Sequence, residues 1–240
     1  MINKDMYLVE DRVWYSDINM KGNLGVVPLV DHFQNGAYAN AADLGHSVKV
    51  LSENKKAWLL ASWNIYIKRY PKLDEKIFLG TGPYNFKGIL GYRNNCMWDE
   101  NEELIAWADA IWFFFDGNVG KPVRPAPEDS FGRYQMIEGI EMEHEPRKIF
   151  LPENMTSCPE RKVDWRTIDT NQHVNNSQYI GMALDALDRF MEPKHIRVEY
   201  VKAAVLGDII IPRIGEKDGR IVVDLSDPDG QTYAAVEIEE

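Results

Sequence analysis

One order of elements occurs twice along this chain: a stretch with helical spacing, then several runs typical of strands. In the first half, apolar residues recur at helical spacing over residues 30–44, between Pro28 and Gly45, which are common helix start and stop signals. In the second half, a similar apolar face covers residues 179–190 and ends before Pro193. The spacing predicts one helix in each half, and the repetition indicates an internal duplication.

Strand-like runs follow both predicted helices. In the first run Trp63, Ile65 and Ile67 alternate with polar residues, as expected of a half-buried strand. The other predicted strands are Lys76–Tyr84, Tyr92–Asp99 and Leu104–Phe115 in the first half, and Ile196–Lys202, Asp208–Ile214, Arg220–Ser226 and Gln231–Glu239 in the second. Residues that favour turns separate neighbouring runs. Each copy is therefore predicted to be a helix followed by a four-stranded antiparallel meander.

The segments ahead of the two helices also resemble each other, with Asp17-Ile-Asn19 in one and Asp169-Thr-Asn171 in the other. A Pro-rich stretch from about residue 116 to residue 160 connects the copies. A helix beside a sheet leaves apolar surface on both that needs cover, so each sheet should curve around its helix. Such units leave an elongated apolar cleft, which suits a long apolar ligand.

Composition and charge exclude several function classes. Hydrophobic residues make up 45% of the 240 residues and charged residues 27%, which is typical of a globular protein. The N-terminal segment lacks the features of a signal peptide, and no stretch reaches the roughly 18 apolar residues that span a bilayer. We therefore expect a cytoplasmic protein that does not bind membranes.

The formal net charge of -11 argues against nucleic-acid binding, because a phosphate backbone attracts clustered Lys and Arg. An acidic protein partner would need a local basic patch on this chain. The candidates are Arg147-Lys148, the run from Arg161 and Lys162 to Arg166, and Arg189 with Lys194 and Arg197.

Two cysteines, Cys96 and Cys158, stand far apart and match no metal-ligand or redox spacing. We expect two ordinary thiols, and no metal or cofactor.

Residues able to perform chemistry gather just ahead of the second predicted helix, at Asp169, Asn171 and His173. Residues in this position lie near unpaired backbone N–H groups and the positive end of the helix dipole, which stabilise negative charge on a carbonyl oxygen. His173 is a candidate general base, since an imidazole accepts a proton near neutral pH. Asn171 is a candidate for donating to an oxyanion or holding a water, and Asp169 for orienting the imidazole or polarising the water. The alternative is that these residues only cap the helix and form turns.

The motif Asp169-x-Asn171-x-His173-Val-Asn175-Asn176-x-x-Tyr179-Ile180-Gly181 resembles the signature of the acyl-acyl carrier protein thioesterases of plants and bacteria. Other stretches resemble the same family, so the resemblance covers nearly the whole chain. They are His32-Phe-Gln34, Trp63-x-Ile-x-Ile-x-Arg69-Tyr-Pro71, Gly91-Tyr92-Arg93 and the region from Trp112 to Pro122-Val-Arg124-Pro125.

The resemblance implies an α+β chain with a tandem hotdog fold, in which each of two long helices is wrapped by a curved antiparallel sheet. It implies an N-terminal hotdog domain at residues 1–130, a linker at 131–160 and a C-terminal hotdog domain at 161–240 that carries the catalytic motif. The implied activity is hydrolysis of fatty acyl thioesters on the phosphopantetheine of acyl carrier protein, which releases free fatty acid. The family's catalytic Asp, Asn and His fall on Asp169, Asn171 and His173.

The chain departs from the family after Tyr200-Val-Lys202. The family has a glutamate there, and plant members also have a cysteine, whereas this chain has Ala203 and Ala204. Without a nearby cysteine, direct attack by water is the mechanism to expect. Asp169 is then the evident acid of the cluster, because Glu199 lies four residues from Ala203, about 13 Å along a strand.

Other functions remain open from the sequence. The same fold could serve a non-catalytic protein that binds acyl chains or the acyl carrier, or an acyl-coenzyme A thioesterase. A dehydratase would need a histidine and an acid facing one acyl carbon, and His32 and His46 are the first-half candidates. Neither acyl chain length nor the choice between monomer and homodimer follows from the sequence.

Overall fold

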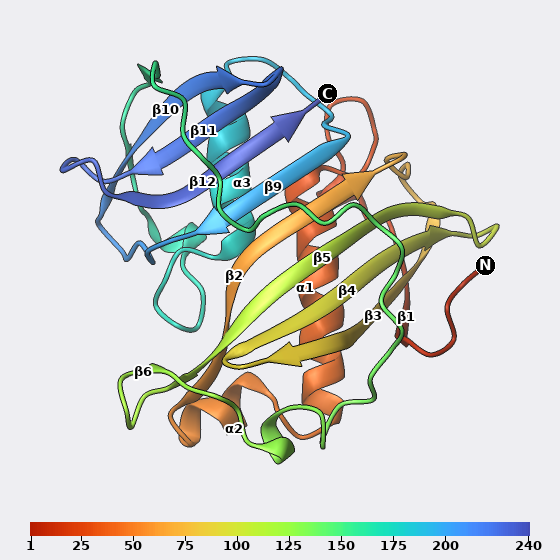
Figure 1. The fold of residues 1–240 in the computed structure, drawn as a ribbon. Helices are drawn as coiled ribbons and strands as arrows, with labels where there is room; N and C mark the ends of the chain where they lie inside the picture. Colours follow the sequence, from red (N-terminus) through yellow and green to blue (C-terminus); the bar gives the residue numbers. More distant parts are fainter. The chain divides into compact units, whose positions relative to one another are not determined.

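The computed structural model describes residues 1–240, which divide into two units. The first unit comprises Met1–Ala61 and Ile65–His144, and the second comprises Ser62–Asn64 and Glu145–Glu240. In both units a helix packs on one face of an antiparallel sheet (Figure 1). None of the helices combines the length and the apolar character needed to cross a membrane.

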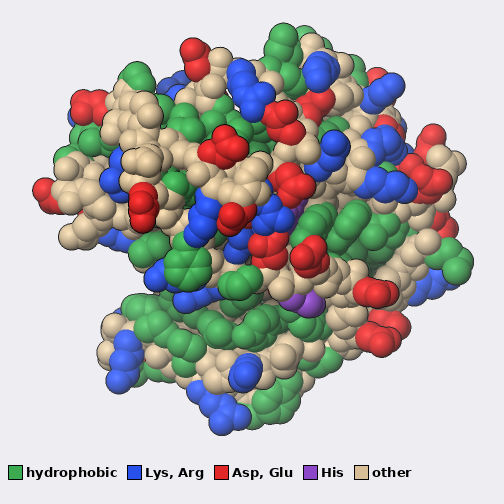
Figure 2. Space-filling model, turned by 45° about the horizontal axis from the view of Figure 1, so that its top comes forward, with side chains coloured by type: hydrophobic (Ala, Val, Ile, Leu, Met, Phe, Trp, Pro, Cys, Tyr) green, Lys and Arg blue, Asp and Glu red, His purple; other side chains and the backbone are tan.

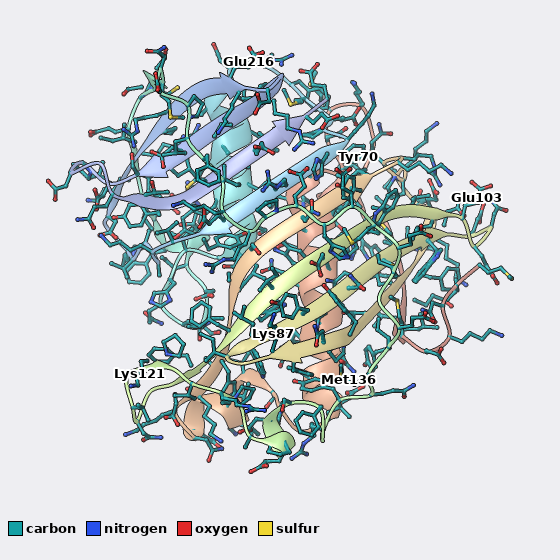
Figure 3. All side chains as sticks on the ribbon, in the orientation of Figure 1. Tyr70, Lys87, Glu103, Lys121, Met136 and Glu216 are labelled. Carbon is teal, nitrogen blue, oxygen red and sulfur yellow. The ribbon has the colours of Figure 1, made fainter.

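The first unit contains a long helix, a short helix and five main strands. Its elements are β1 (Tyr7–Arg12), η1 (Tyr15–Asp17), α1 (Val26–Asp43), α2 (Val48–Glu53), β2 (Lys56–Ile67), β3 (Lys76–Lys87), β4 (Leu90–Asp99), β5 (Leu104–Asp116), β6 (Lys121–Pro122) and η2 (Pro127–Asp129). The helix α1 matches the prediction closely, whereas α2 was not predicted. Hairpin turns join β3 to β4 and β4 to β5, and Lys87 and Glu103 mark these turns at opposite ends of β4 (Figure 3).

The second unit has fewer helical residues and shorter strands. Its elements are β7 (Thr156–Ser157), β8 (Arg161–Lys162), η3 (Trp165–Thr167), α3 (Asn176–Ala186), β9 (His195–Tyr200), β10 (Ile209–Lys217), β11 (Arg220–Ser226) and β12 (Thr232–Glu239). The predicted strands of this half agree with β9 to β12 to within about two residues at most ends, which is the usual uncertainty of strand boundaries.

The predicted meander is wrong in one respect. In the first unit the strands lie in the order β1-β3-β4-β5-β2, and in the second in the order β9-β12-β11-β10-β7. The first strand after each helix therefore pairs with the last strand of its unit and not with the next one. Strands that follow one another in sequence are expected to pair with one another. This expectation does not reveal that the first strand after the helix pairs with a strand much later in the sequence.

The helix α1 buries its apolar face against its own sheet. Its residues Leu29, Phe33 and Ala37 recur every four positions and are buried, as are Ile77 and Leu79 on β3. Residues four apart lie on one side of a helix, and alternate residues lie on one face of a strand. The core of the first unit thus lies between α1 and the strands it contacts.

The Pro-rich segment after β6 covers sheet surface in both units. In the first unit the Ile137 N–H donates to the Pro83 carbonyl at 3.0 Å, and the Ile140 N–H donates to Asn94 Oδ1 at 3.0 Å. In the second unit the Ile149 N–H donates to Glu199 Oε2 at 2.9 Å. Both sheets therefore have a helix on one face and this segment on the other.

Candidate active site

The loop between η3 and α3 carries the three predicted site residues. It is closed by a bridge between Ile168 and Val174 and by a hydrogen bond from the Asp169 N–H to the His173 carbonyl at 2.8 Å. Gln172, at its tip, has a φ of 63°, a left-handed conformation that only a few residues tolerate. The structure thus brings Asp169, Asn171 and His173 together in one tight loop.

The first unit contains the same loop with different side chains. A bridge joins Ile18 to Leu24, and the Asn19 N–H donates to the Asn23 carbonyl at 2.7 Å. Asn19 and Asn23 therefore occupy the positions of Asp169 and His173. The predicted equivalence of Asp17-Ile-Asn19 with Asp169-Thr-Asn171 is wrong by two residues, because the same residue types stand at different positions of the two turns. Only the second loop carries an acid and an imidazole at these positions.

The Asp169 carboxylate organises this loop. Its Oδ1 accepts hydrogen bonds from the backbone N–H groups of Asn171 at 2.8 Å and His173 at 3.3 Å. Its Oδ2 accepts from the Asn171 side-chain amide at 3.3 Å. The carboxylate therefore contacts the backbone of His173 and not its ring, so in this geometry it fixes the loop and the Asn171 amide.

The imidazole of His173 is half-buried and makes no hydrogen bond or ion pair with another side chain. Its backbone forms a bridge with Val205, which fixes the point from which the ring extends. The Asn171 side chain is exposed. Both groups therefore keep unused hydrogen-bonding capacity for a water or a ligand.

Asn175 confirms part of the capping alternative. It precedes α3, and its Oδ1 accepts from the Ser177 N–H at 3.1 Å, which is the usual N-cap bond. Asp169, Asn171 and His173 do not cap the helix in this way. They lie ahead of the cap, beside the helix end where the dipole is positive.

Tyr179 belongs to this site, although its motif position alone gave it no role. Its hydroxyl accepts a hydrogen bond from the Ala204 N–H at 2.9 Å. Burial raises the pKa of the Tyr179 phenol to about 12. The negative charges of Asp208 and Asp169 raise this pKa further.

Asp208 is the second acid of this region. Its Oδ2 accepts from the Val205 N–H at 3.0 Å and from the Tyr233 hydroxyl at 3.1 Å. Asp169 was the evident acid of the cluster in the sequence, and Asp208 lies at the turn next to the loop, because Val205 also forms a backbone bridge with His173. Glu199 is not a substitute, since its carboxylate accepts from the Ile149 N–H.

Neither cysteine is placed to act as a nucleophile near this loop. Both are free thiols, and burial raises the pKa of the Cys96 thiol to about 12. The Cys158 thiol lies 3.8 Å from the Ala186 carbonyl, at the far end of α3. No three His, Cys, Asp or Glu side chains lie close enough together to ligate a metal ion.

His32 and His46, the two histidines considered for a dehydratase, each face an acid. His32 Nδ1 lies 3.5 Å from Asp11, and His46 Nε2 lies 3.8 Å from Asp129. Burial lowers the pKa of His46, and the Arg133 charge lowers it further, so this ring favours its neutral form. Each histidine has a different acid, so the structure does not bring the two rings to one acidic group.

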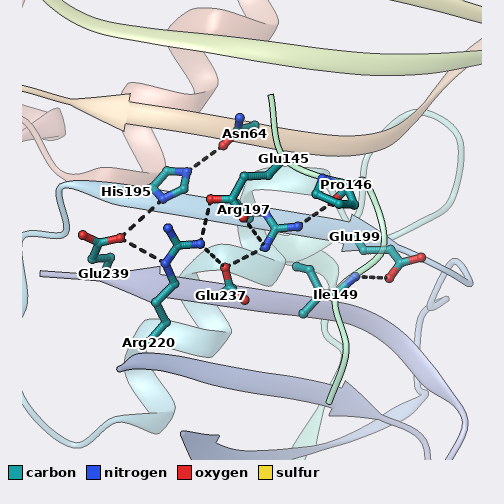
Figure 4. A network of polar contacts seen from close by, with 10 residues as sticks. All are labelled: Asn64, Glu145, Pro146, Ile149, His195, Arg197, Glu199, Arg220, Glu237 and Glu239. Carbon is teal, nitrogen blue, oxygen red and sulfur yellow. Dashed lines mark hydrogen bonds and ion pairs between the residues drawn. The ribbon is translucent and has the colours of Figure 1, made fainter. Parts of the chain in front are cut away.

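One predicted basic patch is wrong. Arg197 is buried, and its Nη1 contacts Glu145 at 2.9 Å and Glu237 at 2.7 Å (Figure 4). Arg220 reaches the same two glutamates, at 2.7 and 2.9 Å. Arg189 pairs with Glu240. These arginines are neutralised within the second unit and leave little positive surface for an acidic partner.

The basic run from Arg161 to Arg166 consists of exposed arginines that form ion pairs with acidic residues. Arg161 pairs with Asp185 at 2.8 Å, and Arg166, which is 89% exposed, pairs with Asp164 at 2.8 Å. On the face shown in Figure 2, basic side chains lie interspersed with acidic ones. Exposed pairs of this kind are weak and are screened by salt. Arg166 could therefore exchange its partner for an acidic protein at little cost.

Comparisons with known proteins agree with this geometry. Residues 4–130 match the acyl-ACP thioesterase N-terminal domain family, and residues 153–239 match the acyl-ACP thioesterase C-terminal domain family. A palmitoyl-acyl carrier protein thioesterase from the chloroplast of Gossypium hirsutum is 24% identical over 187 residues. That match covers 71% of this chain and 44% of the cotton protein, so the chain spans less than half of that relative.

Solved structures share the fold over the whole chain. An acyl-ACP thioesterase from Bacteroides thetaiotaomicron is 21% identical, with a TM-score of 0.86 that covers 98% of this chain and 97% of the other. The 12:0-ACP thioesterase from Umbellularia californica is 12% identical, with a TM-score of 0.82 that covers 100% and 98%. These similarities confirm the expected α+β fold with two hotdog units.

Proposed function

Because the chain belongs to the acyl-ACP thioesterase family, we propose that it hydrolyses acyl thioesters of acyl carrier protein. The products are a free fatty acid and the thiol of the carrier's phosphopantetheine. The observation that carries the proposal is the Asp169–His173 loop at the start of α3, which lies within the matched C-terminal domain. The matched ranges leave residues 131–152 between them, and we keep 1–130 and 161–240 as the proposed domains, joined by a linker at 131–160.

His173 is the proposed general base. A water held beside its imidazole gives up a proton to the ring and attacks the thioester carbon, which forms a tetrahedral oxyanion. Collapse of this intermediate breaks the carbon–sulfur bond, and the departing sulfur takes the proton back from the imidazolium. The absence of any side-chain partner on the ring supports this role, because its acceptor nitrogen is then available.

Asn171 and Asp169 have supporting roles in the proposal. The Asn171 amide keeps one N–H beyond its bond to Asp169 and can donate it to the oxyanion, or use its oxygen to hold the water. Asp169 is a positioning residue, because it holds the loop amides of Asn171 and His173 in place.

Ala203 and Ala204 favour a second candidate function. Without the family's glutamate, the chain could bind acyl chains or the acyl carrier without catalysis. Asp208 and Tyr179 argue for retained chemistry, since they place a second carboxylate and a hydroxyl at the same turn. Acyl-coenzyme A is the alternative substrate, because it presents the same thioester on the same phosphopantetheine arm.

The test is release of free thiol from acyl carrier protein carrying acyl chains of several lengths, with the matching acyl-coenzyme A esters in parallel. His173→Ala should lower turnover about a hundredfold or more, and Asn171→Ala should cost roughly 3 kcal/mol of transition-state stabilisation. Asn23→Ala is the matched control, because Asn23 holds the equivalent position in the first unit. Undiminished turnover by His173→Ala would show that the base is another group.

Two further outcomes separate the alternatives. Binding of acyl carrier protein with no thiol release by the parent protein would favour the non-catalytic function. Docking on exposed basic residues such as Arg166 predicts that hydrolysis of the carrier-bound chain falls with salt more steeply than hydrolysis of the coenzyme A ester. Equal salt dependence would contradict such docking.

A further inference from the structure

A two-residue segment, Ala204 and Val205, supports the backbone of the proposed base. The Val174 N–H donates to the Ala204 carbonyl at 2.9 Å, and Val205 forms a bridge with His173. Both side chains of the segment are apolar, so it contributes only backbone groups to hydrogen bonding. The point from which the imidazole extends therefore depends on how firmly this supporting segment is itself held.

Two side chains hold the supporting segment through its backbone N–H groups. The Tyr179 hydroxyl, on α3, accepts from the Ala204 N–H at 2.9 Å. Asp208 Oδ2 accepts from the Val205 N–H at 3.0 Å, and it also accepts from the Tyr233 hydroxyl at 3.1 Å. The helix and the turn thus fix two consecutive N–H groups of the same segment.

The first unit contains half of this arrangement. Its loop residue Asn23 forms a bridge with Lys72, and the Lys72 N–H donates to Glu75 Oε2 at 2.9 Å. Lys72 and Glu75 therefore repeat the arrangement of Val205 and Asp208. Support by an acid at the turn is a shared feature of both units and does not by itself indicate catalysis.

The second side-chain acceptor is confined to the unit whose loop carries an imidazole. In the first unit the Leu24 N–H donates to the Pro71 carbonyl at 2.7 Å, which makes Pro71 the counterpart of Ala204. Proline has no backbone N–H, so no bond equivalent to that of Tyr179 can form there. Only the supporting segment beside His173 is held on two consecutive residues.

We infer that Tyr179 and Asp208 are positioning residues for His173 in thioester hydrolysis, an inference that rests on the function proposed above. They fix the supporting segment, and this segment fixes the backbone of the base. A displacement of about 1 Å in a reacting group can cost about a hundredfold in rate, so loss of either acceptor should lower kcat. KM should stay near the parental value, because neither side chain is proposed to contact the acyl chain or the carrier.

The experiment is thiol release by the full chain from the acyl carrier protein substrate that the parent hydrolyses fastest. Asp208→Ala should lower kcat about tenfold or more and leave KM within about twofold of the parental value. Asp208→Asn keeps an oxygen that can accept from the Val205 N–H, so it should restore most of the loss. A parental kcat in Asp208→Ala, or an equal loss in Asp208→Asn, would overturn the inference.

Glu75→Ala is the matched control, since it removes the equivalent hydrogen bond from the first unit. It should lower Tm, because Glu75 also pairs with Arg69, but it should leave kcat unchanged. A loss of kcat equal to that of Asp208→Ala would show that reduced stability, and not the position of the base, explains the effect.

Amide hydrogen exchange at Val174 measures the support without any catalysis. This buried amide should exchange faster in Asp208→Ala and in Tyr179→Phe than in the parent, because its acceptor is held less firmly. If the parent releases no thiol, the proposed function fails, whereas faster exchange would still support the positioning of His173. Unchanged exchange in both variants would overturn it. If Asp208→Ala does not fold, Tyr179→Phe decides, and a parental kcat in that variant would overturn the inference.

Discussion

Replacing Gly36 by alanine should stabilise the first unit. The residue lies inside α1, where glycine costs about 1 kcal/mol relative to alanine. The added methyl would be buried at ordinary contact distance, 3.8 Å from Thr81 Cγ2, and burial of one such group contributes about 0.8 kcal/mol. The expected gain in unfolding free energy is therefore about 1–2 kcal/mol.

Gly80→Ala is the matched substitution with the opposite expected sign. A Cβ at Gly80 would lie 2.5 Å from Cζ3 and 2.8 Å from Cη2 of the Trp98 ring, which is itself buried. Overpacking of this kind typically costs about 1–3 kcal/mol. The same change of residue should thus stabilise the protein on the helix and destabilise it on the strand.

Scanning calorimetry with urea unfolding would measure both effects. For a chain of this size, 1 kcal/mol corresponds to a shift in Tm of about 2–4 °C. If the two units unfold in separate transitions, only the transition of the first unit should move. A Gly36→Ala protein that melts at or below the parental temperature would refute the reasoning.

Three further predictions concern other parts of the chain. Tyr179→Phe should cost about 1–3 kcal/mol of stability in urea unfolding, because it leaves a buried backbone N–H without an acceptor; an unchanged midpoint would contradict this bond. Burial opposes ionisation of Glu75 and Asp99, but hydrogen bonds from Arg69 and from backbone N–H groups outweigh it and lower both pKa values. Their contribution to stability is therefore complete above the ordinary values of 4.5 and 3.8 and is lost as the pH falls below them; acid titration of Arg69→Met should show a smaller loss over that range, and an identical profile would argue against the pairing. Alkylation of the native protein should modify Cys158 before the buried Cys96, as peptide mass analysis would reveal, and faster labelling of Cys96 would be inconsistent with its burial.

Much of the fold could be predicted from periodicity. The helix spacing over residues 30–44 and the alternation on the strands reflect which side chains face each core, so α1 and β3 to β5 were found close to their true bounds. The strand order was not predicted, because β2 and β5 have no sequence feature that marks them as partners. The short helix α2 was missed since six residues give too little periodicity to recognise.

The sequence predicted the site residues that share one loop and missed those that only the tertiary structure brings next to it. Asp169, Asn171 and His173 share one loop, as the motif predicts, and their catalytic roles stay a prediction. Tyr179 and Asp208 join the loop only through the chain reversal near Ala204, which spacing in the sequence cannot reveal. The ion pairs that bury Arg197 were equally hidden, because Glu145 and Glu237 come from distant segments.

The segment between the matched family domains has a consequence for dividing this protein into separately expressed halves. Its first part, up to His144, caps the outer sheet surface of the first unit, and the part from Glu145 onward caps that of the second. A gene cut at residue 130 would strip the first half of that cover and expose the backs of β3 and β4. A cut between His144 and Glu145 leaves each fragment with the segment that covers its own sheet. Two polypeptides divided at this point should therefore assemble into the folded protein.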